Sequence, residues 1–203
     1  GLSTEKTAMN GKKVGIALVA LLGAGTLAAP ALAQNEQFIP NLVYRTGAYA
    51  PNGVPFANGY ADYLKLVNTK GGINGVKVSY EECETGYATD KGVECYERLK
   101  GKGTGAVVFN PLSTGITYQL IPKAGVDKIT VHSMGYGMTA AADGRWFPWV
   151  FNFPTTYWSQ ASSVIRYMGQ QEGGLDKLKG KKIVHVFHNS PYGKEANPTL
   201  EEL

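Results

Sequence analysis

The sequence has few of the residues, and none of the short motifs, on which common catalytic centres are built. Its 203 residues include two cysteines and three histidines. No H-E-x-x-H zinc motif, G-x-S-x-G nucleophile motif or phosphate-binding P-loop occurs. His185 and His188 lie three residues apart in an expected strand, so they face opposite sides and cannot share a metal ion. We therefore expect neither an enzyme nor a bound metal or cofactor.

The sequence also lacks the clustered basic residues that nucleic-acid binding requires. The formal net charge is +4, and it falls to +2 over residues 34–203, which hold 17 basic and 15 acidic side chains. No basic run lies on an expected helix or beside a ladder of aromatic residues. The composition, 43% hydrophobic and 18% charged, is that of a globular protein without a nucleic-acid partner.

The long apolar run of the chain lies near its N-terminus. Two lysines precede the run at residues 14–29, and the small-residue sequence A-L-A follows it at residues 31–33. This order predicts a signal peptide over residues 1–33, with an N-terminal extension, cleaved between Ala33 and Gln34. Glycines and Pro30 interrupt the run, which disfavours a permanent membrane span. We expect an exported, periplasmic protein.

The two cysteines agree with export. Cys83 and Cys95 enclose 11 residues, and an oxidising compartment favours a disulfide between them. Such a bond stabilises a domain by about 3 kcal/mol in the chain-entropy model. A catalytic cysteine paired with a histidine is the alternative, but no local signature supports it. The acidic segment 82–90 lacks the ligand spacing of a calcium-binding EF-hand, and we interpret it as a solvated loop beside the disulfide.

After the apolar run, strand-like and helix-like patterns alternate. Such alternation predicts a parallel sheet with helices on both faces. The expected strands are 41–49, 76–82, 105–110, 128–133 and 181–188, and the expected helices are 57–72, 89–103, 113–125, 159–174 and the beginning of one in 189–203. The last segment has an apolar face with nothing after it to pack on. We interpret residues 36–152 as a first α/β lobe and residues 153–203 as a crossover and the beginning of a second, truncated lobe.

Four stretches carry a resemblance to a known family. In chain order they are T-G-A-Y-A-P-N-G, V-N-T-K-G-G-I-N-G-V-K-V, V-V-F-N-P-L-S-T-G and S-P-Y-G-K-E. The chain resembles the substrate-binding proteins of ABC importers with the type I periplasmic-binding-protein fold, in the branch of leucine/isoleucine/valine-binding proteins. That family typically has N-x-x-G-G-I-x-G between its first helix and second strand, where residues 68–75 stand here. The resemblance implies a doubly wound parallel sheet in each of two lobes, of which this chain holds the N-terminal half. The glycine-rich turn itself has an architectural role, because its positive-φ positions favour glycine.

In an open α/β sheet, ligands bind beyond the carboxyl ends of the strands. The loops 49–53, 110–115 and 132–137 are expected to meet there. Ser113 and Thr114 can cap the helix that follows, and the free N–H groups of a helix N-terminus attract a carboxylate. The resemblance implies that Ser113 and its neighbours bind the α-carboxylate of the ligand. A role for Ser113 as a helix cap alone is the alternative.

The other candidate contacts come from the resemblance and from aromatic side chains near the expected cleft. Ordinary packing is the alternative for Met134 and Tyr136, and a place in the hinge is the alternative for Tyr157 and Trp158. The acid that usually binds the ligand ammonium in this family would lie beyond Leu203. The candidate ligand-binding residues are Tyr49, Asn52, Asn110, Leu112, Ser113, Thr114, Ser133, Met134, Gly135, Tyr136 and Tyr192.

These features together predict a monomeric periplasmic receptor that closes two lobes around a small solute. The first candidate solute is an amino acid, branched-chain or otherwise aliphatic, and short amides or urea come next. The expected partners are an ABC permease and its ATPase. A ligand-sensing ectodomain or regulator of the same fold is the main alternative, and an exported enzyme is the third.

Overall fold

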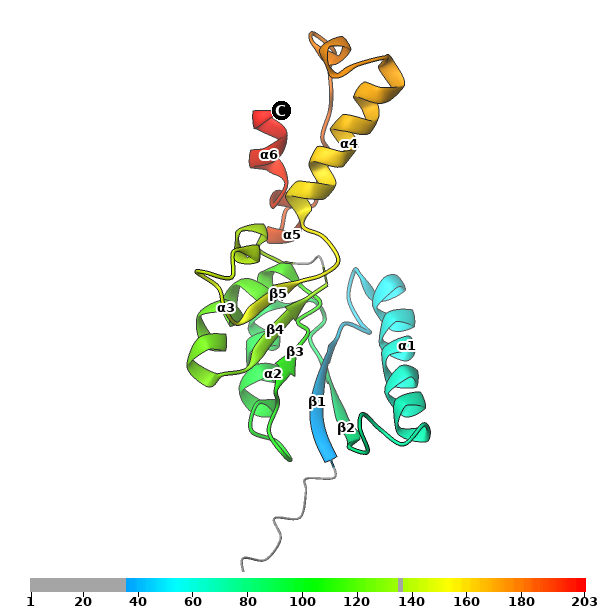
Figure 1. The fold of residues 1–203 in the computed structure, drawn as a ribbon, viewed down its shortest axis with the longest axis vertical. Helices are drawn as coiled ribbons and strands as arrows, with labels where there is room; N and C mark the ends of the chain where they lie inside the picture. The colour runs from blue at the N-terminus through cyan, green and yellow to red at the C-terminus, as the bar shows by residue number, and fades with distance from the viewer. Residues whose placement is uncertain (1–35, 135–136) are drawn as a thin grey trace, which may run out of the picture. The chain divides into compact units, whose positions relative to one another are not determined.

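The computed structural model describes residues 36–134 and 137–203 (Figure 1). The predicted signal peptide and two predicted contacts, Gly135 and Tyr136, lie outside the described residues. The described strands are all parallel. Strand β1 (Glu36–Val43) pairs with β2 (Lys77–Glu84), and β4 (Thr130–Ser133) pairs with both β3 (Val108–Phe109) and β5 (Val150–Asn152).

A single parallel bridge joins the two groups of strands. It links Asn41 in β1 to Asn110, the residue that follows β3. The resulting order is β2-β1-β3-β4-β5. Succeeding strands are added on one side of β1 and then on the other, so a topological switch point lies between β1 and β3. In sheets of this kind the ligand crevice opens at the switch point, beyond the carboxyl ends of the strands.

Helices cover both faces of the sheet, as the alternating pattern predicts. Helix α1 packs on one face of β1 and β2, and α2 and α3 pack on the other (Figure 1). The core on the α2–α3 side centres on the fully buried rings of Tyr96 and Phe109, whose centroids are 4.6 Å apart. The helices are α1 (Ala50–Thr69), α2 (Thr89–Leu99), α3 (Thr114–Asp127), α4 (Tyr157–Glu172), α5 (Pro191–Lys194) and α6 (Asn197–Glu202), with 3₁₀ turns η1 (Thr139–Ala142) and η2 (Leu175–Leu178).

The glycine-rich turn after α1 has the architectural role expected of it. Gly71, Gly72 and Gly75 all have positive φ, and a Cβ atom on Gly72 would lie 2.0 Å from the carbonyl oxygen of Val76. The side-chain amide of Asn68 then pairs with the backbone of β2, donating one hydrogen bond and accepting another as a neighbouring strand would. Its Nδ2 donates to the Val78 carbonyl (2.7 Å), and its Oδ1 accepts from the Val78 N–H (2.8 Å). The Asn and Gly residues of this motif therefore fasten the end of α1 to β2.

The first strand and first helix differ from the sequence-based prediction. Strand β1 ends at Val43, and α1 begins at Ala50, seven residues before the expected start at 57. The prediction took Pro51 and Pro55 as loop residues. Pro51 lies at the second helical position, where no intrahelical N–H bond is required, and Pro55 removes only one such bond.

The strand predicted over residues 181–188 is wrong. These residues form no strand, and the side chains of Val184 and Val186 are 83% and 88% exposed. A strand needs a neighbour for its N–H and C=O groups, and within the described ranges no strand pairs with this segment. Strand β5 was not predicted, because three residues are too few to show an alternating pattern.

Candidate functional site

The N-terminus of α3 lies directly after the carboxyl end of β3, beside the switch point. Ser113 is the N-cap of α3, and its Oγ accepts a hydrogen bond from the Ile116 N–H (3.3 Å). Thr114 Oγ1 shares a hydrogen bond with the Tyr157 hydroxyl (2.8 Å). Leu112 precedes them at φ +52°, and its N–H donates to Asn110 Oδ1 (3.4 Å). The structure thus gathers four of the predicted site residues at one helix N-terminus and buries them all.

A cluster of tyrosine rings lies beside this helix N-terminus. We call Tyr44, Tyr49 and Tyr87 the tyrosine cluster. The centroids of Tyr49 and Tyr87 are 4.3 Å apart, and Tyr44 meets the other two rings edge-on at 5.4 and 6.4 Å. The three residues follow β1 or β2, at the same edge of the sheet as Ser113. His188 contacts the Tyr49 ring edge-on at 5.4 Å.

Tyr87 connects the tyrosine cluster to the α3 N-terminus. Burial, with the neighbouring Tyr49 and Tyr44, raises the pKa of the Tyr87 phenol, while a hydrogen bond with Ser113 acts in the opposite direction. Burial and the nearby Tyr192 likewise raise the pKa of Tyr49. Both phenols therefore stay neutral around pH 7. Ring faces and neutral hydroxyls suit a solute that combines a planar or apolar part with hydrogen-bond acceptors.

Tyr87 is the functional candidate that sequence reasoning missed, since segment 82–90 was interpreted as a solvated loop. The signal that would have found it is its place after a parallel strand. The ligand rule for open sheets applies to the loop after β2 as much as to the loops after β1, β3 and β4. The contact between its ring and Tyr49 is tertiary and has no local sequence pattern.

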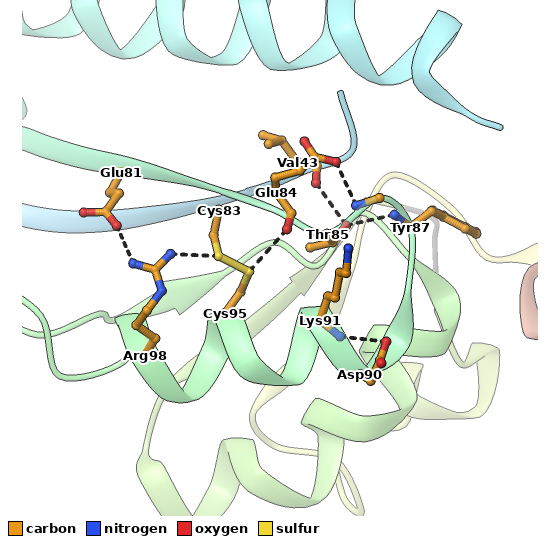
Figure 2. Close-up of a disulfide and its surroundings, with 11 residues drawn as sticks. Val43, Glu81, Cys83, Glu84, Thr85, Tyr87, Asp90, Lys91, Cys95 and Arg98 are labelled. Carbon is orange, nitrogen blue, oxygen red and sulfur yellow. Dashed lines mark hydrogen bonds and ion pairs between the residues drawn. A yellow bond between two sulfur atoms is a disulfide. The ribbon is translucent and has the colours of Figure 1, made fainter. Parts of the chain in front are cut away.

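The turn that carries Tyr87 is held from three directions (Figure 2). The predicted disulfide between Cys83 and Cys95 is present and joins β2 to α2. Glu84 accepts hydrogen bonds from the backbone N–H groups of Arg45 and Gly86, both at 2.8 Å. Thr85 donates from both its N–H (2.8 Å) and its hydroxyl (2.9 Å) to the carbonyl of Val43.

The other predicted contacts are spread over the edge of the sheet. Ser133 is buried at the end of β4, and Met134, which follows it, is half-buried. Asn52 is exposed in the first turn of α1. Tyr192 is 39% exposed, and its ring centroid lies 5.7 Å from that of Tyr157. The structure therefore brings Tyr49 and Tyr87 together with the α3 N-terminus, whereas Asn52 points to solvent.

Residues 191–195 contact α3, η1 and α4 through Glu195. The Glu195 carboxylate accepts hydrogen bonds from the Tyr118 hydroxyl in α3 and from the Thr139 N–H in η1, the latter at 2.6 Å. The Glu195 backbone carbonyl accepts from Trp158 Nε1 (2.9 Å). One residue thus links α3, η1 and α4.

Two further findings apply to residues 36–134 and 137–203. Within these ranges, no three His, Cys, Asp or Glu side chains are grouped so that they could hold a metal ion. No helix among the same residues is both long and apolar enough to cross a membrane.

Comparisons with known proteins agree with this geometry. No curated protein matches the chain. A solved structure described as an ABC transporter permease from the Pseudomonas fluorescens group is 46% identical, with a TM-score of 0.72 over 83% of this chain and 41% of its own. The branched-chain amino acid substrate-binding protein LivJ from Streptococcus pneumoniae, in complex with isoleucine, is 20% identical (TM-score 0.64; 81% of this chain, 45% of its own).

A solute-binding protein of an ABC transporter from Rhodopseudomonas palustris, in complex with 3,4-dihydroxybenzoic acid, is 16% identical (TM-score 0.64; 83% of this chain, 43% of its own). The last two likenesses show the fold alone. In each of the three comparisons the chain spans less than half the length of the matched protein. The sequence profile described as "Periplasmic binding protein" matches residues 36–203, from the start of β1 to the last residue. The chain therefore belongs to the periplasmic binding protein family, whose members bind substrates and are not enzymes.

Proposed function

We propose that the chain is the ligand-binding part of a periplasmic receptor that delivers a small solute to an ABC permease. The observation that carries this proposal is the α3 N-terminus, with Ser113 and Thr114, at the switch point of a sheet in this family. The N–H groups and hydroxyls gathered there suit a carboxylate. The receptor is exported by the predicted signal peptide and works as a monomer with the permease and its ATPase.

In this proposal residues 36–152 form the first lobe, and residues 153–203 form the crossover and the beginning of the second. The solute binds between the lobes, and the hinge closes them around it. The first candidate is an amino acid, and the resemblance of the sequence to the leucine/isoleucine/valine-binding branch favours an aliphatic one. Short amides and urea are next. A ligand-sensing ectodomain of the same fold would use the same site, and it differs in having no permease partner.

A thermal-shift screen of the purified protein against amino acids, short amides and urea tests the proposal. The full reading frame that encodes the chain is screened beside residues 34–203. A solute at 100 times its Kd stabilises the folded state by about 2.7 kcal/mol, which raises the Tm by several degrees. A rise with one chemical class supports the receptor and identifies its solute. No rise with any of them, in a folded full-length protein, contradicts the amino-acid and amide assignments.

Two N-cap variants distinguish a role of Ser113 in solute binding from a role in helix capping alone. Ser113→Ala removes the cap of α3, and Thr156→Ala removes the equivalent cap of α4, where Thr156 accepts from the Ser159 N–H (3.3 Å). Each loss is expected to reduce stability by about 1 kcal/mol. Only Ser113→Ala is expected to abolish the solute-induced rise in Tm. An undiminished rise in that variant assigns Ser113 to capping alone.

A further inference from the structure

We propose that the solute carries a planar ring beside its carboxylate, and that Tyr87 is the residue that selects this ring. The inference rests on the proposed function and names its substrate class. The shared chemistry is a carboxylate attached to an aromatic ring, found both in aromatic amino acids and in simple aromatic acids.

Tyr87 has φ +65°, in the left-handed region that glycine adopts without strain. Among the described residues only three other non-glycine side chains share this region: Asn74, Leu112 and Lys128. Asparagine tolerates the conformation, and Lys128 is the C-cap of α3, where left-handed residues are common. Tyr87 and Leu112 are different, because they follow β2 and β3 on either side of the candidate site. A bulky side chain in this region at the ligand edge of a sheet indicates a functional demand for that side chain.

The surroundings of Tyr87 hold this conformation firmly. Glu84 binds the N–H of Gly86 immediately before it, and the Tyr87 N–H donates to Thr85 Oγ1 (3.1 Å). The same Thr85 is tied to the end of β1, and the disulfide lies one residue before Glu84 (Figure 2). The turn is therefore fixed before any solute arrives, as a selective binding surface requires.

The ring of Tyr87 contacts the other tyrosine rings, and its phenol lies near the proposed carboxylate site at Ser113. Ser113, the cap of α3, interacts with the Tyr87 phenol, and the Tyr87 ring centroid lies 4.3 Å from that of Tyr49, with the two ring planes tilted by 50°. All three rings of the tyrosine cluster are half-buried, so part of each remains open to a ligand. A solute whose carboxylate lies at the α3 N-terminus would place its neighbouring group against these rings. Aromatic rings pair at centroid distances of about 4.5–7 Å, which favours a planar ring over an aliphatic branch.

Isothermal titration of the full-length protein with L-phenylalanine, benzoate and L-leucine tests the inference. We expect the wild type to bind at least one aromatic probe at least tenfold more tightly than L-leucine. A response to L-phenylalanine alone assigns an aromatic amino acid, and a response to benzoate alone assigns an aromatic acid. Tyr87→Gly, in which glycine suits the backbone, is expected to fold and to lose at least tenfold in affinity for the bound aromatic probe.

Three further variants keep the test decisive. Tyr87→Asn replaces Tyr87→Gly if the glycine variant fails to fold, since asparagine also tolerates positive φ. Tyr87→Phe keeps the ring and is expected to retain most of the aromatic affinity. Lys128→Gly relieves the same backbone strain at the far end of α3, and it is expected to leave the affinity unchanged.

The outcomes separate this inference from the proposed function. Binding of L-leucine without either aromatic probe overturns the inference and leaves the receptor intact. Aromatic binding that is unaffected in Tyr87→Gly or Tyr87→Asn also overturns the role of Tyr87. Binding of none of the three probes, nor of any amino acid or amide in the screen, overturns the inference and the proposed class of solute together.

Discussion

Asn41 shows how a single residue at the switch point affects stability. It is completely buried in β1, and its side-chain oxygen and nitrogen have no hydrogen-bond partner among the described residues. An unsatisfied buried polar group costs about 1–3 kcal/mol. We therefore expect Asn41→Val to raise the free energy of unfolding by at least 1 kcal/mol, measured by urea denaturation.

Asn110, across the bridge from Asn41, supplies the control for this prediction. It is also buried, but its Oδ1 accepts from the Leu112 N–H. Asn110→Val is expected to lower stability, because it leaves that N–H without its partner. Equal effects of the two substitutions would show that the two amides are equally satisfied.

The hydrogen bonds of Glu84 are expected to make the stability of the fold depend on pH. Burial disfavours its ionised form, but hydrogen bonds from the N–H groups of Arg45 and Gly86 and from Thr46 outweigh burial and lower the pKa of the carboxyl. Its pKa in the unfolded chain is about 4.3. The ionised group thus stabilises the fold fully above about pH 4.3, and this stabilisation is lost as the pH falls through the lower folded-state pKa.

Glu84→Gln is therefore expected to lower the Tm at pH 7, with a difference from wild type that shrinks below about pH 4.3. Thermal melts between pH 7 and pH 2 measure this difference. Glu94→Gln, on the exposed side of α2, is the control and is expected to follow the wild type. A gap that stays constant down to pH 2 would show that the charge of Glu84 contributes nothing.

Two helical glycines show that the choice of residue inside a helix depends on packing against neighbouring elements as well as on helix propensity. A Cβ atom on Gly92 of α2 would lie 2.4 Å from Ile116 Cδ1 in α3, whereas one on Gly59 of α1 would meet nothing within 4 Å. Alanine gains up to about 1 kcal/mol over glycine inside a helix. Overpacking a core costs about 1–3 kcal/mol.

We expect Gly59→Ala to stabilise the protein by about 0.5–1 kcal/mol and Gly92→Ala to destabilise it despite the same gain in propensity. Urea denaturation of both variants checks the two signs. Stabilisation by both substitutions would mean that Ile116 moves aside without cost, and that α2 and α3 are not closely packed at this point.

The disulfide couples two elements, the end of β2 and the middle of α2. For a loop of this size, the double variant Cys83→Ser/Cys95→Ser is expected to lower the free energy of unfolding by about 3 kcal/mol. Chemical denaturation of the variant, beside wild type with and without reductant, measures the loss. Reductant is expected to weaken the wild type and leave the variant unchanged. Wild-type protein that shows free thiols in the native state contradicts the pairing.

Sequence patterns predicted the elements that are determined by residues within the same segment. The helix at α3 and the glycine turn after α1 follow from capping and backbone preferences that each segment carries itself. The strand expected at 181–188 failed because Val184 and Val186 show only that a segment can be a strand, and pairing depends on partners elsewhere. Tyr87 was missed for the same physical reason, since its ring contacts, Tyr44 and Tyr49, come from the loop after β1.

For the molecule as a whole, the switch point brings the predicted ligand edge together with the segment that follows α4. His188 contacts Tyr49, and Glu195 binds both Tyr118 and Thr139. In the proposed receptor these contacts join the first lobe to the beginning of the second. Their strength would then influence how readily the lobes close, as well as how stable the fold is.

The Glu195 contacts can be tested by a double-mutant cycle. Burial and the Glu195 carboxylate raise the pKa of Tyr118, so its O–H remains a donor throughout the neutral range. Tyr118→Phe removes the donor of this bond and Glu195→Ala removes its acceptor, so we expect a coupling of about 1 kcal/mol or more between them in urea denaturation. Additivity within about 0.5 kcal/mol would show that the two side chains do not interact in solution. Because the bond joins the proposed lobes, Glu195→Ala is also expected to change the solute Kd, whereas Glu201→Ala, exposed on α6, is expected to leave it unchanged.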